Sequence, residues 1–152
     1  MKKALYVLVI GLGIGLASCC GCRKVKSLPI TRTEWQLIEM NGKVIDRPEG
    51  GEQYSLRLGD DGRFSGMGDC NRCMGGYTLD EKRDRIEFSQ VASTRMMCPN
   101  QQQENQYFAI LNDARGYKID GQFLLLLNDQ RNIIASFKNV GNPDANAEHV
   151  VR

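Results

Sequence analysis

The stretch Tyr54–Met67, YSLRLGDDGRFSGM, decides the fold of this chain. Apolar and polar residues alternate with a period of two on both sides of Asp61-Gly62, and this alternation is typical of half-buried β-strands. An Asp-Gly pair between two such runs favours a tight hairpin turn. The stretch therefore predicts two neighbouring antiparallel strands, each with one face toward a core and one face toward water.

Similar short runs lie on both sides of this hairpin. Asn41-Gly42 and Asp120-Gly121 are further hairpin signals, and Asp80–Asp84 is a charged turn. Phe123–Leu127 is apolar on both faces, so we expect it at the centre of the sheet, beneath a helix. The stretches with strand character are residues 35–38, 43–45, 54–58, 63–67, 75–79, 85–88, 117–119, 123–127 and 133–137.

The apolar period changes once, between residues 99 and 115. Pro99 suits the first turn of a helix, and Gly116 suits its C-terminal cap. Between them, apolar residues recur every three or four positions and form one stripe, which includes Tyr107, Phe108 and Leu111. These features predict an α+β fold: a compact, strongly curved, mostly antiparallel sheet of about seven to eight strands, packed against one main helix. We expect Trp35 to share the core with this stripe.

The N-terminus has the layout of a secretory leader. Two lysines precede an apolar run that is too short to cross a bilayer comfortably, and Leu16-Ala17-Ser18-Cys19 follows. This order resembles the lipobox of bacterial lipoproteins, which implies a signal peptide at residues 1–18 and a lipid-modified Cys19. Residues 19–30 would then be a lipidated tether to the bacterial cell envelope, facing the periplasm or at the outer membrane. An ordinary signal peptide is the alternative.

Charge and histidine content argue against several classes of function. The leader carries Lys2 and Lys3 and no acidic residue, so the net charge of +2 falls to zero once the leader is removed. Residues 31–152 have a net charge of −3 and lack the basic stripe of a nucleic-acid-binding domain. The single histidine, His149, lies in residues 141–152, which read as a flexible C-terminal tail. Without a candidate base we expect no enzyme and no cofactor.

Acidic residues offer a weaker catalytic hypothesis, a hydrolase that uses Asp60, Asp61 or Asp69. Asp60-Asp61-Gly62 is more simply explained as a turn. We therefore predict no catalytic residue.

Cysteines Cys70, Cys73 and Cys98 allow structural, redox or metal-binding interpretations. A redox C-x-x-C pair usually opens a helix, whereas Cys73 precedes Met74-Gly75-Gly76, and a zinc site would lack ligands. We therefore predict one structural disulfide and no metal. In the chain-entropy model, Cys70–Cys98 closes a loop of about 29 residues worth roughly 3.5 kcal/mol, more than Cys70–Cys73 could provide. Pairings that involve Cys73 stay open, because entropy does not show geometry.

Three further motifs lie along the chain. They are the opening Trp35-Gln36-Leu37 with Asn41-Gly42, the stretch Arg63-Phe64-Ser65-Gly66…Cys70-Asn71…Gly76-Tyr77, and Thr94-Arg95-Met96-Met97-Cys98 ahead of Glu104. In their order and spacing they resemble the META domain family, whose bacterial members are called HslJ-like proteins. In this chain Asp69 replaces a glycine of the family pattern, and Cys73 is an additional thiol. The resemblance covers residues 31–140. It implies a compact one-helix domain with motif residues Trp35, Asn71, Gly76, Tyr77, Thr94 and Met96.

Family resemblance also implies a place in the cell envelope, heat-shock induction and tolerance of novobiocin, without an accepted catalytic site. The sequence thus predicts a monomeric, non-enzymatic envelope lipoprotein that binds an envelope protein or a small-molecule ligand, or supports the envelope under stress. The alternative is a lipoprotein for thiol redox chemistry or for copper or zinc handling. It would use Cys70, Cys73 and Cys98, with Met67, Met74, Met96 and Met97 nearby.

Overall fold

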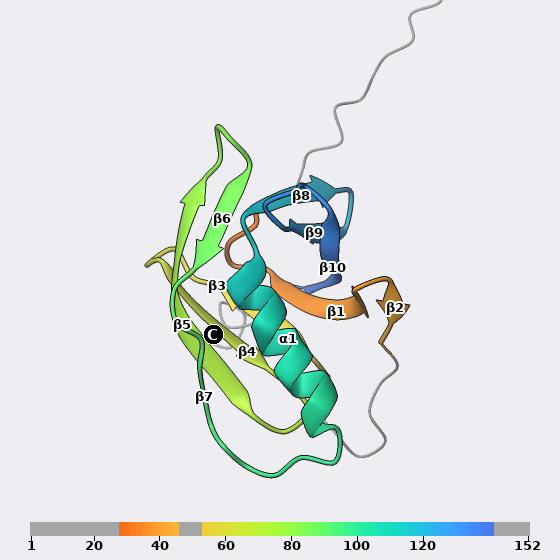
Figure 1. Cartoon of the computed structure of the whole chain (residues 1–152). Helices are drawn as coiled ribbons and strands as arrows, with labels where there is room; N and C mark the ends of the chain where they lie inside the picture. Colours follow the sequence, from red (N-terminus) through yellow and green to blue (C-terminus); the bar gives the residue numbers. More distant parts are fainter. Residues whose placement is uncertain (1–27, 46–52, 142–152) are drawn as a thin grey trace, which may run out of the picture.

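A computed structural model describes residues 28–45 and 53–141 of the chain (Figure 1). It contains ten strands and one helix in this part. They are β1 (Glu34–Met40), β2 (Lys43–Val44), β3 (Ser55–Leu58), β4 (Arg63–Met67), β5 (Arg72–Asp80), β6 (Arg85–Phe88), β7 (Ala92–Ser93), α1 (Gln101–Asp113), β8 (Gly116–Asp120), β9 (Phe123–Leu127) and β10 (Ile133–Gly141). The expected signal peptide, Cys19 and His149 lie outside the described residues.

All paired strands are antiparallel and follow the order β6-β5-β4-β3-β1-β10-β9-β8, with β2 on β1 and β7 on β5. The sheet curves until its two ends approach each other (Figure 1). There the Tyr117 amide donates to the Asp84 carbonyl, with 3.0 Å between nitrogen and oxygen. The result is an almost closed barrel with a single helix, so the predicted α+β class is confirmed.

The hairpin of residues 54–67 forms as the alternation predicts. Ser55 pairs with Met67 and Leu58 with Phe64. Leu56, Leu58 and Phe64 are buried, and their polar neighbours in sequence are more exposed. Gly62 in the turn has a φ of +75°, a backbone conformation that glycine adopts without strain.

Helix α1 lies across the concave side of the barrel. Tyr107 is fully buried, and its ring lies 5.4 Å from that of Tyr54 and 6.4 Å from that of Phe137 on β10. The Tyr107 hydroxyl donates to the Ser55 carbonyl at 2.8 Å. Trp35 and Leu111 are buried in the same core, as the sequence predicted. The helix has 13 residues and is neither long nor apolar enough to span a membrane, and no other helix occurs in the described residues.

Strand β9 is not central, so that expectation was wrong. It is second from the β8 end of the sheet. Leu124 and Leu126 face the core, whereas Phe123 is 41% exposed and Leu125 is half-buried. Exposed apolar side chains are common on protein surfaces, so a continuous apolar run does not specify position in a sheet.

The end of α1 also differs from the expectation. Ala114 is the C-terminal cap, in an extended conformation, and Gly116 already begins β8. A Cβ at Gly116 would lie 3.2 Å from the Asp84 carbonyl oxygen and 2.6 Å from a guanidinium nitrogen of Arg131. The close approach of Asp84 and Arg131, rather than a positive φ, therefore favours glycine at position 116. At the other end, Pro99 lies just before the helix and Asn100 is the N-cap.

Sequence patterns missed β7, a two-residue strand that pairs with β5 at Cys73 and Met74. Two residues are too few to show a period.

The first buried residue of the barrel is Ile30, whose carbonyl accepts a hydrogen bond of 2.9 Å from the Trp35 indole.

We predict that Leu111→Ala lowers the free energy of unfolding by about 2–5 kcal/mol, because Leu111 is fully buried and its truncation leaves a cavity. Phe108 is only half-buried, so Phe108→Ala should lose less, about 1–2 kcal/mol. Urea denaturation with the disulfide intact measures both. An equal or larger loss for Phe108→Ala would contradict this packing.

Candidate functional site at the disulfide-bonded loop

The loop between β4 and β5, residues 68–71, lies against the N-terminal end of α1. A disulfide joins Cys70 in this loop to Cys98 just before the helix, with 5.7 Å between their Cα atoms. This is the pairing that loop entropy favoured. It ties together two segments that are 28 residues apart in sequence.

Glu104, in the first turn of α1, lies under this loop and is fully buried. Its carboxylate accepts hydrogen bonds from the backbone amides of Cys70 at 3.2 Å and Asn71 at 2.9 Å. The side-chain amides of Asn71 and Gln101 donate to it at 2.6 and 3.2 Å. Four donors and the positive end of the helix dipole thus compensate the buried charge.

Asn71 extends this network to the segment before the helix. Its Oδ1 accepts hydrogen bonds from the Met96 amide at 2.7 Å and the Thr94 hydroxyl at 2.9 Å. Its Nδ2 also donates to the Met96 carbonyl at 3.0 Å. One buried side chain therefore holds both backbone groups of Met96, as a neighbouring strand would.

Asp69 supplies the cap that α1 lacks. The side chain of the N-cap Asn100 makes no capping hydrogen bond, whereas Asp69 accepts the Asn100 backbone amide at 2.9 Å. Asp69 is 1% exposed and is not among the residues with positive φ. The glycine of the family pattern is therefore not required at position 69 by backbone conformation.

Gly68 allows the loop to lie this close to the helix. A Cβ at Gly68 would be 2.5 Å from Glu104 Oε1 and 3.0 Å from its carboxyl carbon. We refer to Gly68, Asp69, Asn71, Glu104 and the Cys70–Cys98 disulfide as the Glu104 hub.

Cys73 is the unpaired cysteine of the described part, and it is buried. Burial, with a further contribution from the charge of Glu104, raises the pKa of its thiol to about 12. Since the thiolate is the reactive form, Cys73 is an inert thiol near neutral pH.

Cys70, Cys98 and Glu104 have potential ligand atoms within 4.8 Å of one another. Two thiolates and a carboxylate at this spacing would suit a soft metal ion. In this structure the two sulfur atoms are bonded to each other, so the donor set exists only after reduction.

Beside the Glu104 hub lies a surface hollow of about 320 Å³. Met96 and Met97 at its edge are 55% and 98% exposed. The full lining is Asn71, Ser93, Thr94, Arg95, Met96, Met97, Gln101, Glu104, Asn105 and Phe108. Polar groups of the hub thus form the floor, and exposed thioethers form part of the rim.

The other motif residues do not converge on this hollow. Trp35 is in the core. Gly76 donates its backbone amide to the Ser89 hydroxyl at 3.0 Å, and the Tyr77 hydroxyl donates to the Gly59 carbonyl at 2.7 Å. Both contacts stabilise the barrel wall.

The carboxylates considered for hydrolysis are occupied by structural contacts. Asp60 forms an ion pair with Arg32, and Asp61 accepts the Arg63 backbone amide at 3.1 Å in the β3–β4 turn.

Sequence reasoning missed the roles of Glu104 and Asp69. An acidic residue in the first turn of a helix was a usable signal for Glu104, because it favours interaction with free backbone amides. Nothing in the local sequence of Asp69 indicates that it caps a helix 31 residues away.

Residues 28–141 match the family model of the META domain. The chain belongs to the META domain family. The Glu104 hub therefore lies within a META domain.

Solved structures agree with this fold. A Burkholderia xenovorans protein studied by NMR is 28% identical, with a TM-score of 0.55, covering 72% of this chain and 83% of that one. A DUF4847-family crystal structure from Bacteroides vulgatus is 18% identical, with a TM-score of 0.53, covering 72% and 93%. At that identity the second likeness concerns the fold alone. No curated protein matches the chain.

We predict that Cys73 resists alkylation in the native protein at pH 8, because its pKa of about 12 leaves almost no thiolate there. Iodoacetamide labelling followed by peptide mass spectrometry should modify Cys73 only after unfolding in urea. The same digest without reduction should contain Cys70 linked to Cys98. Native labelling of Cys73, or a linked peptide that contains it, would contradict this assignment.

Proposed function

We propose that this META-domain protein is a lipid-anchored protein of the bacterial envelope that acts by binding and catalyses no reaction of its own. The Glu104 hub carries this proposal. Its acidic, amide and sulfur groups are engaged in holding loop, disulfide and helix together. Groups engaged in the fold in this way form a rigid surface.

Envelope anchoring is supported by the sequence before the described residues. Leu16-Ala17-Ser18-Cys19 follows a short charged and then apolar leader. A structural disulfide agrees with an oxidising compartment, because such bonds persist outside the cytoplasm.

For the binding surface we propose the hollow beside the Glu104 hub. Met96 and Met97 offer exposed, adaptable apolar contacts over a polar floor that includes Asn71 and Thr94. This combination suits an envelope protein or a small molecule with an apolar part and a few hydrogen-bonding groups. We place this binding in the response to envelope stress, with heat-shock induction and tolerance of novobiocin, as the family resemblance implies. We also propose that the protein acts as a monomer.

Thiol redox chemistry or copper or zinc handling is the second candidate function. The spacing of Cys70, Cys98 and Glu104 favours it, since reduction would free two thiolates beside a carboxylate. The disulfide and the buried Cys73 favour the binding function.

Lipid attachment at Cys19 is tested by labelling cells with a fatty-acid probe. Wild-type protein and Cys20→Ala should take up the label, and Cys19→Ala should not, because the lipobox places acylation at Cys19 alone. Equal labelling of Cys19→Ala would rule out this anchor.

The binding role is tested in a strain that lacks the gene for this protein. Wild-type protein should restore growth in novobiocin, and Met96→Ser with Met97→Ser should not. Met74→Ser is the matched control, because Met74 is 48% exposed on β5 and does not line the hollow. Full rescue by the double variant would show that the hollow beside the Glu104 hub is not the binding surface.

A further inference from the structure

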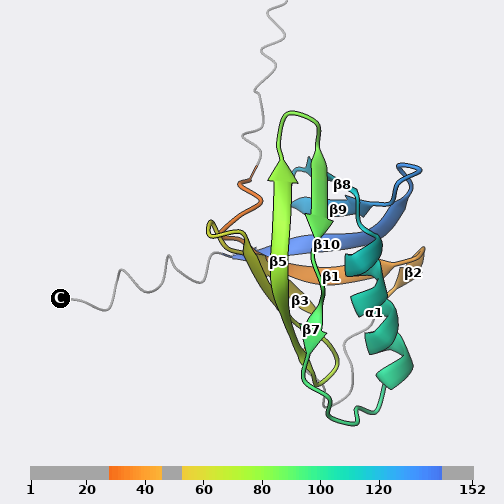
Figure 2. The ribbon, with the colours of Figure 1, turned by 60° about the vertical axis from the view of Figure 1, so that its left-hand side comes forward.

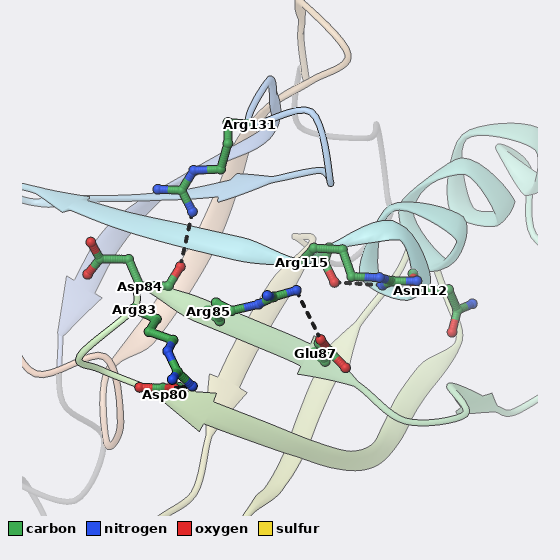
Figure 3. A network of polar contacts seen from close by, with 9 residues as sticks. Asp80, Arg83, Asp84, Arg85, Glu87, Asn112, Arg115 and Arg131 are labelled. Carbon is green, nitrogen blue, oxygen red and sulfur yellow. Dashed lines mark hydrogen bonds and ion pairs between the residues drawn. The ribbon is translucent and has the colours of Figure 1, made fainter.

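A second hollow, of about 270 Å³, lies where the two ends of the sheet meet. Its lining contains four arginines from separate segments: Arg83 and Arg85 around the start of β6, Arg115 between α1 and β8, and Arg131 before β10. Asn128 and Asp129 complete it. Figure 3 shows Arg83 and Arg85 on the β5–β6 hairpin, directed toward Asp80 and Glu87, and Arg115 and Arg131 on the neighbouring segments. We refer to this as the arginine hollow.

Among the described residues, Arg115 and Arg131 are held by backbone carbonyls rather than by carboxylates. Arg115 Nη1 donates to the carbonyls of Asn112 at 2.7 Å and Ala114 at 2.8 Å, at the C-terminal end of α1. Arg131 Nη1 donates to the Asp84 carbonyl at 3.4 Å, beside Gly116. Each guanidinium has five N–H donors, so these contacts fix its position and leave other donors and the full charge available.

Arg83 and Arg85 have carboxylate partners, but the pairs are weak. Arg83 lies 3.3 Å from Asp80 and Arg85 lies 3.7 Å from Glu87, and all four side chains are at least 40% exposed. Exposed ion pairs contribute little and exchange readily. In Figure 3 the Asp84 carboxylate points away from Arg85 and Arg115. Asp129 is the acidic residue of the lining itself, and Asp80 and Glu87 lie beside it as the partners of Arg83 and Arg85.

We propose that the arginine hollow binds a phosphate group. Guanidinium groups bind phosphate oxygens through paired, charge-assisted hydrogen bonds. A phosphate would also offset the charges of Arg115 and Arg131, which within the described part of the chain donate to backbone carbonyls rather than to carboxylates. The hollow is large enough for one such group, and the net charge of −3 over residues 31–152 does not favour a nucleic-acid backbone.

The phosphate can come from a lipid headgroup or from solution. Leu28, the first described residue of the tether, lies at the same end of the barrel, since it lines a neighbouring depression with Asp84 and Tyr117. In an anchored protein this end would lie toward the membrane surface. The headgroup source therefore rests on the proposed function, whereas the phosphate site does not.

NMR titration of the purified full chain tests the proposal. The probes are inorganic phosphate, short-chain phosphatidylglycerol below its micelle concentration, and phosphatidylcholine of the same chain length. Saturable shifts of the Arg115 and Arg131 Nε–H signals should appear with phosphate or phosphatidylglycerol. Tighter binding of phosphatidylglycerol than of both other probes identifies the headgroup source, and tighter binding of inorganic phosphate identifies the free anion.

Arg115→Gln with Arg131→Gln should weaken binding at least tenfold. Arg83→Gln with Arg85→Gln removes the two exposed arginines and should also weaken phosphate binding. This second variant tests the proposal even if the first one is unstable. The matched control is Arg63→Gln with Arg72→Gln, two exposed arginines at the starts of β4 and β5 that line neither hollow. The start of β5 lies at the opposite end of that strand from the β5–β6 turn (Figure 2). Absence of saturable shifts, or equal weakening in the control, would overturn the proposal. If Cys19 is not lipid-modified, phosphate binding by the arginine hollow should be unchanged, so the two proposals can fail separately.

Discussion

The buried carboxylate of Glu104 is the constraint on which this end of the molecule depends. Its charge is tolerated inside the barrel only because the backbone amides of Cys70 and Asn71 and two side-chain amides surround it. Three of these donors belong to the β4–β5 loop, and the fourth, Gln101, belongs to α1 itself, so the helix position and the loop conformation require each other. The Cys70–Cys98 disulfide adds a covalent link between the same two regions.

Neighbouring features follow from this arrangement. Gly68 must lack a side chain because Glu104 occupies the space. Asn71, held by Glu104 on one side, holds the backbone of Met96 on the other and so positions the two exposed methionines. The far end of the barrel is built differently. There the sheet closes through the hydrogen bond from the Tyr117 amide to the Asp84 carbonyl, and Arg115 and Arg131 donate to backbone carbonyls. The domain thus presents a polar and thioether surface at one end and a cationic surface at the other.

Local patterns in the sequence were sufficient for much of this structure. Alternation in residues 54–67 and the stripe around Tyr107 predicted the hairpin and the helix, because periodicity reports which face is buried. Loop entropy favoured the correct disulfide partner for Cys70. The edge-side position of β9, the close approach at Gly116 and the capping by Asp69 could not be predicted, because each depends on residues distant in sequence. From the sequence alone, Glu104 is an ordinary acidic residue in the first turn of a helix, and its contacts with the β4–β5 loop become known only from the structure.

A double-mutant cycle between Glu104→Gln and Asn71→Ala tests the central role of the Glu104 hub most directly. The free energies of unfolding of wild type, both single variants and the double variant are measured in urea with the disulfide intact. If the two side chains act as one network, the losses are non-additive, with a coupling energy of about 1–3 kcal/mol. Losses that add to within about 0.5 kcal/mol would show that Glu104 and Asn71 stabilise the domain independently, and would contradict this account.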